Sequence, residues 1–182
     1  TYSNACNKLL MESAFFFISA APISNYLDVD CSSNPCMTVE LMGTWRMIVE
    51  GANTYSPDPV RKKERRRLER ILYRKKGILI ATDYLVNSGG VIYAAYEKII
   101  PTPDHLQIPD TYISNPESVQ NWLNKNQEKL ALLAEERCTA ASAKLEEVIR
   151  RNMQELINGL CTNKDSLPSD IAEKISINRI SG

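Results

Sequence analysis

The chain has 182 residues, which is enough for one sizeable hydrophobic core or for one domain with an appended segment. Its 22 basic and 22 acidic residues give a formal net charge of zero, so the molecule as a whole offers no electrostatic reason to expect a nucleic-acid or membrane-surface partner. The hydrophobic fraction of 43% is typical of an ordinary soluble globular protein.

The first segment, residues 1–27, is predicted to be helical and has no assigned role. Its helix is expected over residues 5–21, with a broad apolar face and a proline at residue 22 that closes it. The apolar run at residues 14–21 is also compatible with a signal-peptide core, but Glu12 interrupts the approach to it and Lys8 is the only basic residue before it. Because the run is much shorter than the ~20 residues that cross a bilayer, we expect a buried helix and no membrane partner.

A strand–helix–strand unit follows a turn-rich stretch at residues 28–38. The first expected strand covers residues 45–50 and ends at a glycine. Two prolines open a helix that should continue from residue 57 to about residue 76, where Gly77 stops it. Residues 78–81 are wholly apolar and form the second expected strand. Such a βαβ unit with short loops predicts an α/β fold with a parallel sheet.

The rest of the chain, residues 101–182, is predicted to be a helical C-terminal segment. A helix is expected over residues 89–99, and a proline-punctuated surface loop over residues 101–109. Gly159 is expected to help end the following helix, and a short last helix follows Pro168. Apolar residues at spacings of 4, 4, 3 and 4 predict one stripe that packs in a core or on a partner: Leu145, Ile149, Met153, Leu156 and Leu160.

The cysteines indicate a reducing compartment. An odd, scattered set in a chain of this size argues against a disulfide framework, so we expect a cytoplasmic protein. No second Cys or His pair completes the pair Cys31 and Cys36, and His105 lies too far along the chain to be predicted as a ligand, so no metal site is expected. The five cysteines are Cys6, Cys31, Cys36, Cys138 and Cys161.

A strongly basic stretch, residues 61–76, leaves two functions open. It carries ten basic residues and two acidic ones. A helix of this kind can neutralise successive phosphates, so the alternative function for the chain is a non-enzymatic module that binds nucleic acid or a protein through residues 61–76. The ordinary interpretation is the solvent face of a helix packed on a sheet, with Leu68, Ile71 and Leu72 beginning an apolar stripe. We expect the ordinary interpretation, because the rest of the chain cancels the charge.

Two short loops carry the chemistry of the chain. Asn53 and Asn87 each follow an apolar strand, at the sheet edge where α/β proteins bind ligands. Their amides both donate and accept hydrogen bonds, which suits ribose hydroxyls or a carboxamide. Gly89 and Gly90 let a backbone approach a flat ligand closely and begin a helix whose free N–H groups favour an anion. The bland explanation is that Gly51 and these two glycines only make tight turns.

The full strings resemble the family of glutamate, leucine, phenylalanine and valine dehydrogenases. Members of that family carry an "EGAN…TP" loop and, after the next strand, an "NAGGV…E" segment. The corresponding strings here are Glu50–Thr54 and Asn87–Val91, with Glu97 at the expected place. The similarity is strong over about residues 47–98, weak in the later helices and negligible before about residue 28.

This resemblance implies a reversible oxidative deamination of an L-amino acid to a 2-oxo acid and ammonia, with NAD or NADP as the cofactor. Residues 28–100 would be part of a Rossmann-like dinucleotide-binding domain. Gly51, Asn53 and Asn87 would lie on the nicotinamide side of the cofactor, and the substrate would lie against a second group of residues. That group consists of Gly89, Gly90, Val91 and Ala94.

Because this chain departs from the family at several places, it is expected not to be catalytic when it is alone. The family's catalytic lysines and aspartate belong to an N-terminal domain that has no counterpart here, and no G-x-G-x-x-G follows a strand. Two explanations stay open: a part of a longer enzyme that forms a homo-oligomer, or a diverged chain that has lost catalysis. Glutamate-specific members usually carry a serine where Ala94 stands, which predicts a preference that is not strictly for glutamate.

Overall fold

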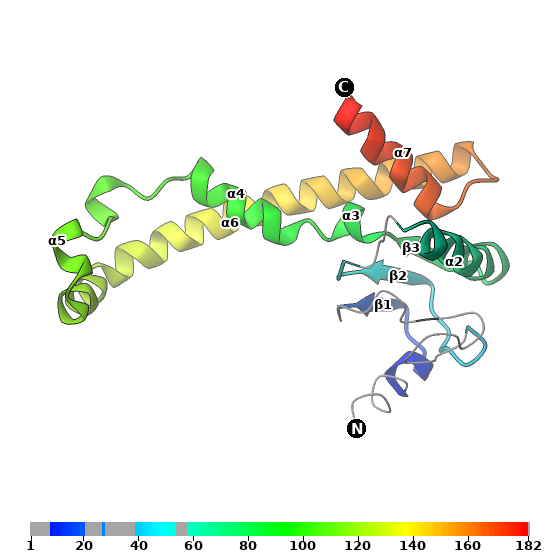
Figure 1. The fold of residues 1–182 in the computed structure, drawn as a ribbon, viewed down its shortest axis with the longest axis horizontal. Helices are drawn as coiled ribbons and strands as arrows, with labels where there is room; N and C mark the ends of the chain where they lie inside the picture. The colour runs from blue at the N-terminus through cyan, green and yellow to red at the C-terminus, as the bar shows by residue number, and fades with distance from the viewer. Residues whose placement is uncertain (1–7, 21–26, 28–38, 54–57, 182) are drawn as a thin grey trace. The chain divides into compact units, whose positions relative to one another are not determined.

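Three short parallel strands form the sheet of the computed structural model, which describes residues 8–20, 27, 39–53 and 58–181 (Figure 1). The strand order is β1-β2-β3, with β1 at Phe16–Ser19, β2 at Met47–Glu50 and β3 at Leu79–Ala81. Helices make up most of the rest. The prediction of an α/β fold with a parallel sheet is therefore confirmed.

Strand β1 corrects the prediction of a helix over residues 5–21. Among the described residues of that range, only 8–11 are helical. The run Phe16–Ser19 pairs in parallel with β2, with Phe16 opposite Met47 and Ser19 opposite Glu50. Aromatic and β-branched side chains favour an extended backbone, and the neighbouring strand supplies hydrogen-bond partners that a four-residue run cannot find alone. Phe16 is 54% exposed, so the buried helix expected here is wrong on both counts.

The predicted βαβ unit is present. Helix α2 (Pro59–Glu69) continues directly into a π-helical turn, η1 (Arg70–Lys75), before β3 pairs with β2. The carboxylate of Asp58 caps α2 by accepting the backbone N–H groups of residues 60 and 61 at 3.0 Å. Gly77 ends the unit's helix with φ of 69°, a left-handed conformation that favours glycine.

The alternation of side chains along the sheet divides the core of this region into two clusters. Ile48 and Ile80 are fully buried on one face, against Leu68 and Leu72 of the basic helix and Trp45. Leu79 lies on the opposite face and packs with the C-terminal helices. That second cluster contains Leu85, Leu156, Leu160, Ile171 and Ala172. The basic helix therefore packs on the sheet, as its ordinary interpretation predicts.

The predicted apolar stripe lies on helix α6 (Pro116–Thr162), and helix α7 (Pro168–Ser181) packs against its end. Its last two members, Leu156 and Leu160, are buried against α7, and Met153 packs at the margin of the same cluster. Gly159 does not end α6, which continues to Thr162. A Cβ at this position would lie 2.5 Å from Cγ2 of Ile171, so the glycine permits a close approach of α7.

Replacing Gly159 with alanine is therefore expected to destabilise the protein. The gain in helix propensity, up to about 1 kcal/mol, is outweighed by an overpacking cost of about 1–3 kcal/mol against the buried Ile171. The matched control is Gly90→Ala, since a Cβ there meets nothing within 4 Å. Urea unfolding of both variants checks this prediction, which is wrong if Gly159→Ala is as stable as the wild type.

The chain divides into two compact units, whose limits differ from the expected boundaries after residues 27 and 100. The first contains residues 1–88 and 149–182, because the end of α6 and the first part of α7 pack in one cluster with Leu79 of the sheet. The second contains residues 89–148. It comprises α4 (Gly89–Ile99), which begins and ends as predicted, the 3₁₀ turn η2 (Asp104–Leu106), α5 (Asp110–Ile113) and the first part of α6.

One arginine holds the proline-punctuated loop within the second unit. The guanidinium of Arg137 donates from Nε to the carbonyl of Ile100 and from Nη2 to the hydroxyl of Thr102, both at 2.9 Å.

In the described residues, no helix is long and apolar enough to span a membrane.

Candidate functional site

The candidate site lies where the strands of the first unit end. In the parallel register, Val49 of β2 pairs with Ala81 of β3, so the carboxyl ends of the two strands are neighbours. The loop after β2 begins with Gly51, and the stretch after β3 contains the short helix α3 (Asp83–Val86). In open parallel sheets this edge is where ligands bind.

The two predicted asparagines meet at this edge. The side-chain amide nitrogen of Asn87 donates a hydrogen bond to the side-chain oxygen of Asn53 over 2.9 Å. Both side chains belong to exposed residues. This bond uses one amide hydrogen and one oxygen, so the NH₂ group of Asn53 and the oxygen of Asn87 present a donor beside an acceptor. The two loops are therefore joined by a direct side-chain contact.

Buried hydroxyl groups lie along the same edge. Ser19 is the last residue of β1, and Thr82 directly follows β3. Both residues are buried, and within the described part of the chain neither hydroxyl has a hydrogen-bond partner; the same holds for the hydroxyl of Ser88. Buried polar groups are normally paired with protein, water or ligand. These three oxygens are the buried side-chain polar atoms of the described residues that have no protein partner.

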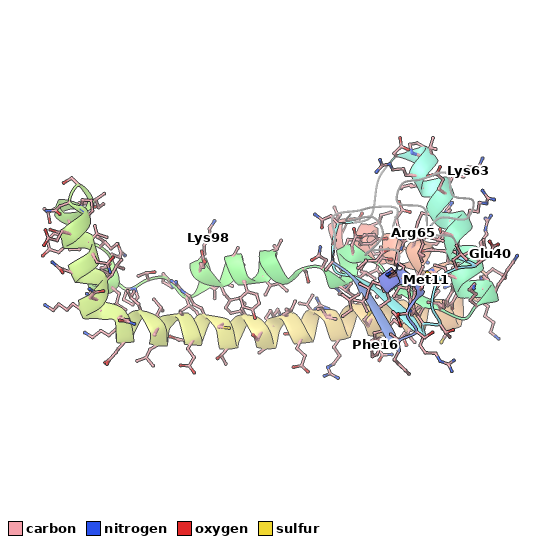
Figure 2. The ribbon with its side chains drawn as sticks, turned by 90° about the horizontal axis from the view of Figure 1, so that it is seen from below. Met11, Phe16, Glu40, Lys63, Arg65 and Lys98 are labelled. Carbon is pink, nitrogen blue, oxygen red and sulfur yellow. The ribbon has the colours of Figure 1, made fainter. Side chains whose placement is uncertain are left out.

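A buried ionic cluster stands directly behind the asparagine loops. The guanidinium of Arg65 on α2 donates to both oxygens of Glu50, at 2.5 and 3.0 Å, and from Nε to Glu69 at 3.1 Å (Arg65 is labelled in Figure 2). Both carboxylates are fully buried, and the Arg65 side chain is 16% exposed. The other oxygen of Glu69 accepts the backbone N–H and the hydroxyl of Ser169, at 3.2 and 2.6 Å.

The start of α7 contributes to holding that negative charge. Ser169 is the second residue of α7, so the carboxylate of Glu69 accepts one of the free N–H groups at the positive end of a helix. The backbone N–H groups of Ser169 and Asp83 and the hydroxyl of Ser169 donate to these two carboxylates and stabilise their negative charge. The cluster ties the sheet, α2 and α7 together.

A second set of contacts braces the other loop. The buried side chain of Asn152 on α6 donates to the carbonyl of Leu85 in α3 over 2.6 Å. Its oxygen accepts a hydrogen bond from Arg179 of α7 at 2.8 Å. Because Asn87 follows α3 directly, the position of this asparagine depends on helices that lie more than sixty residues further along the chain.

The residues predicted to face the substrate belong to the second unit. Gly89, Gly90, Val91 and Ala94 all lie in the first half of α4, whereas Gly51, Asn53 and Asn87 belong to the first unit. Gly90, Val91 and Ala94 are exposed and Gly89 is half-buried. Positive φ among the described glycines occurs at Gly77 alone, so a left-handed turn is not what places glycine at Gly51, Gly89 or Gly90.

Several basic residues of helix α2 form ion pairs within the first unit. Lys62 pairs with Glu173 at 2.8 Å, Arg66 pairs with Asp170, and Arg65 belongs to the buried cluster. The hydrogen bond and the charge of Asp170 raise the pKa of Arg66 above its usual value, so this arginine stays charged until the pH rises beyond that already high range. These pairs reduce the charge available for the alternative function in nucleic-acid binding.

Sequence reasoning missed the buried cluster. The only signal for it is the spacing of Arg65 and Glu69, four residues apart on a helix, together with one acidic residue, Glu50, at the end of an apolar strand. In the part of the chain that the structure describes, no group of three His, Cys, Asp or Glu side chains could hold a metal ion. Cys31 and Cys36 lie outside the described residues. Comparisons with protein-family models, with curated proteins and with solved structures find no match to this chain.

Proposed function

We propose that this chain supplies the nicotinamide side of an NAD(P)-dependent amino-acid dehydrogenase. The three parallel strands would then be part of a Rossmann-like domain, and the catalytic lysines and aspartate would come from outside these 182 residues. The single observation that carries the proposal is the hydrogen bond between Asn53 and Asn87 at the carboxyl edge of the sheet. The two strings that resemble the amino-acid dehydrogenases contain these same two residues.

The residues at this edge fit a nicotinamide nucleoside. The donor of Asn53 and the acceptor of Asn87 are complementary to a carboxamide or to neighbouring ribose hydroxyls. When bound, the cofactor would accept the hydride from the amino acid, while this chain would bind and orient the nicotinamide side of the cofactor.

The substrate side of the proposal rests on α4. Gly89, Gly90 and Val91 would let the amino acid or the 2-oxo acid approach the backbone, and the methyl group of Ala94 would leave a side-chain carboxylate without one hydrogen bond. The proposed enzyme therefore is not strictly specific for glutamate. A cytoplasmic homo-oligomer remains the proposed setting.

The proposal predicts selective binding of nicotinamide mononucleotide by the 182-residue chain. The chain has no G-x-G-x-x-G segment for the pyrophosphate, so a mononucleotide is a sharper probe than the whole dinucleotide. We expect NMR titration to shift the side-chain amide signals of Asn53 and Asn87. Asn53→Ala and Asn87→Ala should each weaken binding roughly threefold to tenfold, the value of one neutral hydrogen bond.

Two controls make this test specific. Adenosine monophosphate carries the same ribose phosphate without the nicotinamide and should leave the asparagine signals unchanged. Asn158→Ala removes an exposed asparagine of α6 in the same unit and should keep wild-type affinity. Equal effects of the two mononucleotides, or no binding by the wild type, would contradict the proposed function. Binding of DNA or RNA that weakens steeply with salt would support the alternative instead.

A further inference from the structure

A single arginine holds the carboxylate that connects the ends of the two strands before the asparagines. Arg65 grips Glu50 with two parallel hydrogen bonds, at 2.5 and 3.0 Å. A bidentate pair of this kind fixes the orientation of the carboxylate as well as its position. Glu50 is the last residue of β2 and lies three residues before Asn53.

The same carboxylate also reaches the second loop. The second oxygen of Glu50 accepts the backbone N–H of Asp83 at 3.3 Å. Asp83 is the first residue of α3, and Asn87 is the residue at which that helix ends. One side chain therefore contacts the beginnings of both loops, and the asparagines contact each other further along them.

We propose that Arg65 is a positioning residue for the asparagine pair: by orienting Glu50, it holds the loops after β2 and β3 at the separation that lets Asn53 and Asn87 share a hydrogen bond. The effect on the pair itself is a property of the fold. The effect on a bound nicotinamide nucleoside rests on the proposed function.

The geometry requires a guanidinium rather than any positive charge. Arg65 presents three N–H directions in one plane, two to Glu50 and one, from Nε, to Glu69 at 3.1 Å. Glu69 is in turn fixed by Ser169 at the start of α7. A lysine in this place would keep the charge but offers a single ammonium group that cannot orient both carboxylates. Arg65→Lys therefore separates the orientation of Glu50 from the neutralisation of its charge.

The test compares Arg65→Lys with the wild type by NMR of the 182-residue chain, first without ligand. We expect the side-chain amide signals of Asn53 and Asn87 to move and their hydrogen exchange to accelerate, because the shared hydrogen bond is lost. Titration with nicotinamide mononucleotide should then show an affinity roughly threefold to tenfold below that of the wild type. The matched control is Arg66→Lys, one residue further along α2, whose pair with Asp170 does not involve the loops.

A second control distinguishes positioning from general stability. Leu10→Ala destabilises the same unit by truncating a buried side chain of the cluster that contains Ile48 and Ile80, and that cluster includes no residue of α3, α6 or α7, so the variant should leave both asparagine signals unchanged. If Arg65→Lys fails to fold, as judged by circular dichroism, Glu50→Gln replaces it. That variant keeps the shape of the side chain and loses the second charged oxygen, and the same loss of the asparagine bond is expected.

The outcomes separate the two proposals. Unchanged asparagine signals in Arg65→Lys and in Glu50→Gln would overturn the positioning role, whatever the ligand does. Changed signals in a wild-type chain that never binds nicotinamide mononucleotide would support the positioning role and overturn the proposed function. Equal changes in Leu10→Ala would reduce Arg65 to an ordinary stabilising residue and would also overturn the proposal.

Discussion

Replacing Arg65 with methionine is expected to lower the free energy of unfolding by about 3–5 kcal/mol, the usual cost of removing one partner from a buried ionic cluster. The methionine fills a similar volume but leaves the carboxylates of Glu50 and Glu69 without their shared cation. Both carboxylates are fully buried, so water cannot replace the guanidinium without opening the contact between α2 and the sheet.

The measurement is urea unfolding followed by tryptophan fluorescence. The chain has two tryptophans, Trp45 in the first unit and Trp122 in the second, so a Trp122→Phe background reports on the first unit alone. Arg66→Met is the control, since Arg66 is 54% exposed and its ion pair should contribute at most about 1 kcal/mol. A loss below about 1 kcal/mol in Arg65→Met would show that the cluster adds little to stability.

A triple variant tests the physical reason for that loss. Adding Glu50→Gln and Glu69→Gln to Arg65→Met removes the two uncompensated charges while keeping the shapes of the side chains. Glutamine removes the charge and keeps an oxygen that accepts from Ser169 or Asp83, but its buried NH₂ group faces the methionine, so we expect part of the lost stability to return. If the triple variant is no more stable than Arg65→Met, lost packing rather than unpaired charge explains the effect.

Replacing Leu156 with alanine is expected to lower the free energy of unfolding by about 2–5 kcal/mol. The side chain projects from the end of α6 and is fully buried against α3 and α7. Leu132→Ala is the matched control: it makes the same change in the same helix, at a side chain that is 66% exposed. That variant should stay within about 0.5 kcal/mol of the wild type.

Urea unfolding of the chain with both tryptophans checks this pair, since Trp45 lies in the unit of Leu156 and Trp122 in the unit of Leu132. A large loss for Leu156→Ala, reported by Trp45, would place the end of α6 in the core of the sheet-containing unit. Equal small effects of the two alanine variants would contradict that arrangement, because a fully buried leucine and an exposed one cannot cost the same when they are truncated.

Local patterns were sufficient for the elements whose signals are strong. The strand that ends at Glu50, the apolar strand before Thr82 and the helix that begins at Gly89 all form where the sequence predicts them. Strand β1 is the exception. A short apolar run has no period that distinguishes a strand from a buried helix, and its strand character comes from pairing with β2, about thirty residues away.

The candidate site also has one part that local patterns predict and another part that they do not. The asparagine pair was predictable because parallel strands end at one edge, so residues that follow two neighbouring strands must come close together. The partner of Glu50 was not predictable, because ten basic residues lie within residues 61–76 and nothing in their order selects Arg65. The selection depends on which face of α2 lies against the sheet.

Local sequence patterns account for the order of the strands and helices in the βαβ unit, the place of the two asparagines after its strands, and the helical nature of the C-terminal part. Hydrophobic periodicity, proline and glycine act within a few residues, so neighbouring residues are sufficient to predict such features. Three features depend on tertiary packing instead: Phe16–Ser19 joins the sheet, Gly159 admits Ile171, and Arg65 holds Glu50. Those three contacts join segments that are distant in the chain or depend on one face of a helix, and burial selects them only after the sheet and its helices have packed.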